Sequence, residues 1–184
     1  FPNLKFLVSP STSTEFIDHN FCKKKKIKII SLENEKFFLR KITPTAEHIL
    51  GLILVISRNY FPAIKSVYDG SFDRRPFGGY KMLSKCNLGI IGYGRIGKIL
   101  KKMSKNIFKR IYTADINNNA NFKKNLIKIF KNSDFISLNI PSQNNKNFFS
   151  KKNLPNFYKS FYLINTSRGD VIDEKFVLGQ LKKK

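Results

Sequence analysis

The chain has 184 residues, a formal net charge of +23, and 41% hydrophobic and 14% aromatic residues. This length predicts one domain plus part of another, and the apolar content excludes global disorder. The longest apolar run, 49–56, is far shorter than the ~20 residues of a membrane-spanning helix, so no membrane partner is expected. The two cysteines, Cys22 and Cys86, are far apart. Their spacing excludes a zinc ribbon or disulfide scaffold, predicts no metal site, and suits a reducing, cytoplasmic location.

The positive charge has a simpler explanation than a nucleic-acid partner. Lys supplies 28 of the 35 cations, and Lys, Asn, Ile, Phe and Tyr together account for 94 of the 184 residues. All five are encoded largely by A/T-rich codons, so genome composition accounts for the excess. Apart from 23–26 and 182–184 the lysines are scattered along the sequence, whereas polyanion-binding proteins more often concentrate them among aromatic side chains. We therefore expect no nucleic-acid partner.

The first part of the chain predicts two strands followed by a buried helix. Apolar runs indicate strands at 4–8 and 26–32, separated by a polar loop at 9–14 and a short turn. Thr43 followed by Pro44 is typical of a helix start, and apolar residues on a wide face predict a buried helix over 45–58. Residues 60–79 mix Pro, Gly, Asp and Arg, which predicts a linker or loop.

From Cys86 onward, short apolar runs alternate with helical spacing. Strands are expected at 88–91, 111–114, 135–140 and 161–164, and helices at 95–107, at 121–131 and from the cap Asp173 through Leu181. Strand–helix alternation of this kind predicts a parallel sheet with helices on both faces, the α/β class.

A glycine-rich turn lies between the first of these strands and the first helix. Its sequence is Gly92-Tyr93-Gly94-Arg95-Ile96-Gly97. Gly92 permits a tight turn, Gly94 lets a pyrophosphate approach the backbone, and Gly97 lets the helix pack against the sheet. The helix N-terminus at Arg95 and Ile96 offers free N–H groups to the phosphates. The alternative is a glycine turn that only packs a strand against a helix.

An acidic residue completes this pattern. Asp115 lies 18 residues after Gly97, at the end of the next expected strand. A carboxylate there accepts hydrogen bonds from the adenosine ribose and repels a 2′-phosphate, so NAD is favoured over NADP. The sequence therefore predicts a Rossmann-like, doubly wound dinucleotide-binding domain.

Four stretches give the chain a clear family resemblance. They are 46–58 (AEHILGLILVISR), 88–97 (LGIIGYGRIG), 133–141 (SDFISLNIP) and 164–173 (INTSRGDVID). In this order the sequence resembles the D-isomer-specific 2-hydroxyacid dehydrogenases, which include D-3-phosphoglycerate dehydrogenase and the glyoxylate/hydroxypyruvate reductases. The resemblance implies an NAD-dependent oxidoreductase that transfers a hydride between the cofactor and a D-2-hydroxyacid or 2-oxoacid.

The resemblance also implies roles for individual residues. Arg168 would be the catalytic residue that binds the substrate carboxylate and polarises the carbonyl, although an Arg at a strand end can also be merely ion-paired. The nicotinamide side of the cofactor would lie beside Asn139, Ile140, Pro141, Thr166 and Ser167. Ser11, Thr12 and Ser13 would match a substrate-binding loop that is usually glycine-rich, so serine would be costly if the loop needs positive φ.

In the family, the general acid is a His paired with a Glu, and the resemblance places both downstream of residue 184. The chain begins at Phe1 rather than Met and stops shortly after an apolar stretch. We therefore expect an incomplete chain, inactive by itself, with 1–42 as the C-terminal part of a smaller α/β substrate domain and 43–184 as an incomplete NAD-binding domain. The resemblance implies a homodimer for the full protein. The alternative function is a non-catalytic NAD-binding regulator or a basic nucleic-acid-binding protein on the same fold.

Overall fold

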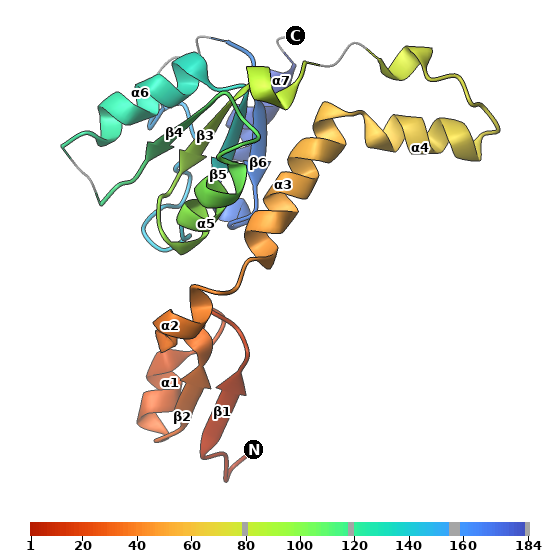
Figure 1. Cartoon of the computed structure of the whole chain (residues 1–184). Coiled ribbons are helices and arrows are strands. Elements are labelled where there is room, and N and C mark those ends of the chain that lie inside the picture. Colours follow the sequence, from red (N-terminus) through yellow and green to blue (C-terminus); the bar gives the residue numbers. More distant parts are fainter. Residues whose placement is uncertain (79–80, 118–119, 155–158, 183–184) are drawn as a thin grey trace. The chain divides into compact units, whose positions relative to one another are not determined.

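The computed structural model describes residues 1–78, 81–117, 120–154 and 159–182 of the chain (Figure 1). They divide into two compact units, Phe1–Ile42 and Thr43–Lys184, each with its own sheet. No helix within the described ranges is long and apolar enough to cross a membrane.

The first unit is a small β–α–β arrangement. Strands β1 (Phe6–Ser9) and β2 (Lys28–Ser31) pair in parallel, with Phe6 opposite Lys28. Between them lies helix α1 (His19–Lys24), which the sequence analysis missed. Asp18 caps it, because its Oδ1 accepts the N–H of Phe21 at 2.8 Å. A 3₁₀ turn (Leu32–Asn34) and the short helix α2 (Lys36–Leu39) complete the unit. Its assignment to a substrate domain stays a prediction.

The second unit contains a four-stranded parallel sheet in the order β4-β3-β5-β6. Its strands are β3 (Asn87–Ile91), β4 (Arg110–Ala114), β5 (Phe135–Leu138) and β6 (Tyr162–Asn165). Its helices in this region are α5 (Arg95–Ser104), α6 (Phe122–Asn132) and α7 (Glu174–Leu181), with 3₁₀ turns at Leu83–Lys85 and Gly169–Val171. The chain passes from β4 across β3 to β5, so the strand order reverses beside β3.

Helices cover both faces of this sheet, as the sequence predicts (Figure 1). Leu88 and Ile90 of β3 pack in a core cluster with residues of α3 (Pro44–Ser57) and α5. Ile91 belongs to a second cluster with residues of α6. A strand that is buried on both faces needs apolar side chains on both, which is why β3 is apolar almost throughout.

The expected helix over 45–58 is present as α3, but its cap differs from the expectation. Thr43 occupies the N-cap position, yet its hydroxyl donates to Glu47 Oε1 at 2.5 Å instead of accepting from the backbone.

The prediction of a linker or loop over 60–79 is partly wrong, because Tyr60–Tyr68 forms helix α4. Asn59, with φ of 47°, is a left-handed residue that separates α3 from α4. Pro62 lies in the first turn, where its missing N–H costs no helical hydrogen bond. The remainder to Gly78 is irregular apart from a 3₁₀ turn at Arg75–Phe77, and Gly79 lies outside the described residues.

Candidate dinucleotide-binding site

The glycine turn after β3 has the conformation that its sequence predicts. Gly92 has φ of +92°, and its N–H donates to the carbonyl of Ala114 in β4 at 2.8 Å. A Cβ on Gly92 would lie 2.5 Å from the carbonyl oxygen of Asn139. Both backbone conformation and space therefore require glycine here. The contact also shows that the ends of β3 and β5 lie directly beside each other.

The other two glycines of the motif have different roles. A Cβ on Gly97 would overlap the carbonyl oxygen of Gly92, so Gly97 allows α5 to approach the turn. A Cβ on Gly94 would meet no atom within 4 Å, and Gly94 has φ of −76°. Packing of this chain therefore does not require glycine at position 94. The space above it is what a diphosphate needs to approach the backbone.

Helix α5 begins directly after this open position. Gly94 is its N-cap, and no side chain caps the helix there. The first N–H groups of a helix have no intrahelical acceptor, and together they carry a partial positive charge. Over ten residues, α5 is long enough to present this charge at its N-terminus. Arg95 and Ile96, both half-buried, begin the helix as predicted.

Asp115 faces the same turn from the end of β4. Its Oδ2 accepts the N–H of Tyr93 at 2.6 Å, and its Oδ1 accepts the N–H of Asn117 at 2.9 Å. A carboxylate has about four acceptor positions, and the described residues occupy two of them, which leaves two for a ligand as far as the described residues go. Asp115 therefore holds the glycine turn in place as well as facing the site, a role that the sequence pattern alone did not predict.

Gly94 and Asp115 line one cavity of about 540 Å³. Its other lining residues are Tyr93, Lys98, Thr113, Asn117 and Asn125. None of these five is among the site residues that the sequence predicts. Lys98 follows Gly94 by four residues and so lies one turn along α5, on the same side of the helix. This spacing is a sequence signal by which Lys98 can be predicted to lie at the site. Asn125 comes from α6, and no local pattern places it beside the glycine turn.

The loop after β5 lies on the other side of the glycine turn. Asn139 donates its N–H to the carbonyl of Ile91 at 2.8 Å, and its side-chain amide donates to Ser137 Oγ at 3.1 Å. Pro141 is exposed, whereas Ile140 is buried in the core cluster that contains Ile91. Since the strand order reverses beside β3, the crevice where ligands bind such sheets lies between the β3 and β5 ends.

The NTSRG segment follows β6 at the same edge of the sheet, one strand beyond β5. Asn165 organises it: its Oδ1 accepts Ser167 Oγ at 2.6 Å and Ser167 N–H at 3.0 Å, and its Nδ2 donates to the carbonyl of Arg168 at 2.9 Å. Thr166 and Ser167 are half-buried and Arg168 is exposed. These three residues do not line the 540 Å³ cavity.

The serine-rich loop of the first unit adopts no strained conformation. The N–H of Ser13 donates to Ser11 Oγ at 3.2 Å, and that of Ser11 to Ser9 Oγ at 3.3 Å. Neither Ser11 nor Ser13 has positive φ. The expected cost of serine there does not arise in this loop. Thr12, between them, is exposed. Across the described ranges, no three His, Cys, Asp or Glu side chains gather to hold a metal ion.

Comparison with known proteins places this geometry in a family. Residues 50–184 match the family model described as the D-isomer specific 2-hydroxyacid dehydrogenase, NAD binding domain. The chain is 28% identical over 187 residues to the glycerate dehydrogenase of Methylorubrum extorquens, covering 98% of this chain and 58% of that protein. It is 27% identical over 178 residues to the hydroxypyruvate reductase of Thermotoga maritima, covering 94% and 56%. The chain thus spans a little over half the length of these relatives.

Solved structures give the same fold. A structure described as the pyruvate reductase of Chlamydomonas reinhardtii aligns with a TM-score of 0.79 at 22% identity, covering 97% of this chain and 53% of that one. A D-lactate dehydrogenase of Aquifex aeolicus, solved with NAD and lactic acid, aligns with a TM-score of 0.74 at 24% identity, covering 99% and 55%. The chain belongs to the D-isomer specific 2-hydroxyacid dehydrogenase family and carries the NAD-binding domain of that family.

Proposed function

We propose that the protein is an NAD-dependent oxidoreductase that transfers a hydride between the cofactor and a D-2-hydroxyacid or the corresponding 2-oxoacid. The observation that carries the proposal is the cavity in which Gly94, Asp115 and the uncapped start of α5 meet. The names of the relatives, glycerate dehydrogenase and hydroxypyruvate reductase, support a small hydroxyacid or oxoacid as substrate.

The residues present fit a dinucleotide. The open position at Gly94 admits the diphosphate, and the first N–H groups of α5 stabilise its negative charge. The free acceptor positions of Asp115 receive the ribose hydroxyls, and its charge disfavours a 2′-phosphate. When bound, NAD(H) supplies or accepts the hydride of the reaction.

Arg168 is the residue we propose to bind the substrate. Its guanidinium can hold a carboxylate through two parallel hydrogen bonds and stabilise negative charge that develops on the carbonyl oxygen. Asn165 fixes the backbone that carries it. We assign proton transfer to neither histidine. His19 Nε2 lies 3.1 Å from Thr14 Oγ1 in the first unit, and His48 is exposed on α3.

We also propose a homodimer, formed through α4. None of the nine residues of α4 is buried, and its exposed apolar side chains include Phe61, Ile64, Val67 and Tyr68. A free helix of this apolar character gains stability by burying its side chains against a partner.

A reducing, cytoplasmic location is proposed as well. Cys22 and Cys86 are free and buried, and burial raises the pKa of the Cys86 thiol, which keeps it unreactive.

The cofactor assignment is tested by titrating NADH into the chain and two variants. The chain contains no Trp, so the fluorescence of NADH can be followed without transfer from tryptophan. Gly94→Ala should fold normally and lose most NADH affinity, because the new methyl fills the space needed by the diphosphate. Gly179→Ala is the matched control, since its Cβ also meets no atom within 4 Å but lies in α7. Equal NADH affinity in the two variants would contradict the assignment.

The substrate assignment is tested separately with Arg168→Gln. In the active protein, this variant should keep NADH affinity and lose about two orders of magnitude or more in kcat/KM with glyoxylate or hydroxypyruvate, because the carboxylate clamp and the charge on the carbonyl oxygen are both lost. An unchanged kcat/KM would contradict the assignment of Arg168 to the substrate site.

A further inference from the structure

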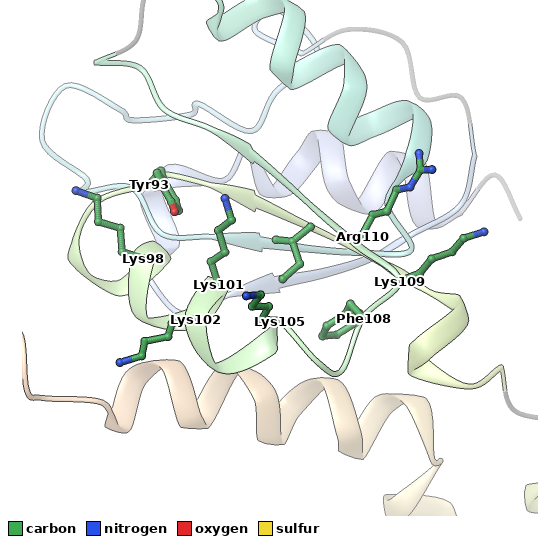
Figure 2. Close-up of a pocket in the computed structure, with 9 residues that line it drawn as sticks. Tyr93, Lys98, Lys101, Lys102, Lys105, Phe108, Lys109 and Arg110 are labelled. Carbon is green, nitrogen blue, oxygen red and sulfur yellow. The ribbon is translucent and has the colours of Figure 1, made fainter.

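A second hollow lies next to the dinucleotide cavity, between α5 and the start of β4. We call it the α5 groove. It has a volume of about 420 Å³. Its lining residues are Tyr93, Lys98, Lys101, Lys102, Lys105, Phe108, Lys109, Arg110 and Ile111. Figure 2 shows a row of these side chains, with Lys98 at one end and Lys109 and Arg110 at the other.

The groove gathers six cations from one short stretch of the sequence, 98–110. Positions 98, 101, 102 and 105 follow the spacing i, i+3, i+4 and i+7, so the first three lie on one side of α5 and Lys105, directly after the helix, continues the row. The turn after α5 and the start of β4 add Lys109 and Arg110. Within the described sheet β4 is an edge strand, so no further strand covers this side.

Within the described part of the chain, no acidic residue lines the groove to neutralise its positive charge. Across the described residues, none of its six cations forms an ion pair, because the ion pairs there involve Lys65, Arg75, Lys81 and Lys159. Like charges three and four residues apart on a helix repel each other. A bound anion with several charges would relieve this repulsion.

The side chains of the groove suit phosphate groups better than bases. Five of the six cations are Lys, which binds a phosphate group as a point charge. Neither of its two aromatic rings is fully open for base stacking. Phe108 is 6% exposed and packs edge-on against Phe135, and Lys101 Nζ lies over the ring of Tyr93, 5.1 Å from its centroid.

We propose that the α5 groove binds a compact anion that carries several phosphate groups, such as an oligophosphate. The lysine row on α5 extends over only about 10 Å of helix axis, which matches a short chain of phosphates better than a nucleic-acid duplex. The groove lies outside the dinucleotide cavity, so the proposal does not depend on the dehydrogenase assignment.

The two hollows share Tyr93 and Lys98. Both would hold negatively charged ligands, and charges that close repel each other. Occupation of the α5 groove should therefore weaken the binding of NADH, and NADH should weaken the binding of the phosphate ligand by the same factor.

The test is calorimetric titration of the chain with inorganic tripolyphosphate. The groove variant replaces Lys101, Lys102 and Lys105 with Gln and leaves the shared Lys98 intact. The matched control replaces Lys123, Lys124 and Lys128, three exposed lysines of α6, so both variants lose the same net charge. We expect the groove variant to bind tripolyphosphate about tenfold or more weakly and the control to bind almost as the parent does. Equal losses in both variants, or no binding to the parent, would overturn the proposal.

Two further measurements distinguish a compact phosphate site from a misfolded variant and from a nucleic-acid surface. Without phosphate, the groove variant should still bind NADH, which shows that the domain is folded. A short DNA duplex should bind more weakly than tripolyphosphate. If the duplex binds more tightly, and the groove variant abolishes that binding, the α5 groove is a nucleic-acid surface and the compact-ligand proposal is wrong. If NADH fails to bind at all, the cofactor assignment fails, and the tripolyphosphate result still decides the proposal for the groove.

Discussion

The backbone N–H of Tyr93 donates to Asp115 Oδ2 at 2.6 Å and so ties the β3–α5 turn to the end of β4. Asp115 is therefore both a wall of the dinucleotide cavity and a support for the glycine turn. The two roles are compatible because the backbone bonds use only part of the carboxylate's acceptor capacity. A ligand that bonds to Asp115 would find the carboxylate already oriented.

Replacement of Asp115 by Ala should affect cofactor choice and stability together. Loss of the carboxylate removes the ribose acceptors and the repulsion of a 2′-phosphate, so NADH affinity should fall about tenfold or more and the preference over NADPH should narrow. Because Tyr93 N–H also loses its partner, the free energy of unfolding should fall by about 1–3 kcal/mol. Calorimetric titration with both cofactors and thermal unfolding measure the two effects. An unchanged ratio of the two affinities would contradict the ribose assignment.

Gly97→Ala should lower the stability of the fold, whereas Gly94→Ala should weaken NADH binding and leave the stability almost unchanged. The added Cβ would overlap the carbonyl oxygen of Gly92, so α5 must shift away from the turn. Overpacking of this kind costs typically 1–3 kcal/mol, and more where the neighbour is backbone. Urea unfolding should show a clear decrease in stability for Gly97→Ala and almost none for Gly94→Ala. Equal stability of the two variants would show that α5 is not held by this contact.

The sequence predicts the β3–α5 turn well because its determinants are local. An apolar strand, a glycine with positive φ and a helical repeat each follow from a few adjacent residues. The sequence also predicts different roles for Gly92 and Gly94, but it does not predict which residue encloses Gly92. That residue is Asn139, directly after β5, and its position beside Gly92 depends on the pairing of β3 with β5.

The missed elements share a physical cause. Helix α1 is six residues long and has one buried residue, Cys22, so it shows no apolar repeat. Helix α4 has an apolar face but no buried residue, and the Pro, Gly and Asp around it indicate a loop. The cavity wall at Asn125 arises from packing between distant segments, and no local pattern contains that information.

The α4 surface gives a prediction about assembly. Replacing both Ile64 and Tyr68 with Glu puts charge on side chains that are 50% and 87% exposed in the single chain. If a second copy covers them, losing their burial costs about 3 kcal/mol or more, so the dimer should dissociate at concentrations about a hundredfold higher or more. Light scattering after size-exclusion chromatography measures the mass. Phe37→Glu is the control, a 76% exposed aromatic of the first unit that should leave the mass unchanged. A parent chain that is monomeric at every concentration would contradict the homodimer proposal.

Asp134 gives a prediction about pH. It connects the start of β3 with the segment before β6, because Oδ2 accepts the N–H of Asn87 at 2.7 Å and Oδ1 contacts Lys81 and Lys159 at 3.1 and 3.0 Å. Partial burial of the carboxyl by itself would raise its pKa, but the hydrogen bonds from Asn87 and the two lysines outweigh it and lower the pKa below the ordinary 3.8. The charged form is therefore favoured in the folded state. The stability that this contributes is complete above the unfolded-state pKa and is lost as the pH falls through the lower folded-state value.

Asp134→Asn should accordingly destabilise the protein at neutral pH, and the destabilisation should be smaller at acidic pH. At pH 7 the free energy of unfolding should fall by about 1.5–3 kcal/mol, the range for hydrogen bonds to charged groups. The difference between variant and parent should shrink as the pH falls below 3.8, where the parent carboxyl becomes protonated too. Urea unfolding over a pH series measures this. Asp69→Asn is the control, since its ion pair with Lys65 is exposed and should contribute almost nothing at any pH. A difference that stays constant from neutral to acid pH would mean that Asp134 acts through its shape rather than its charge.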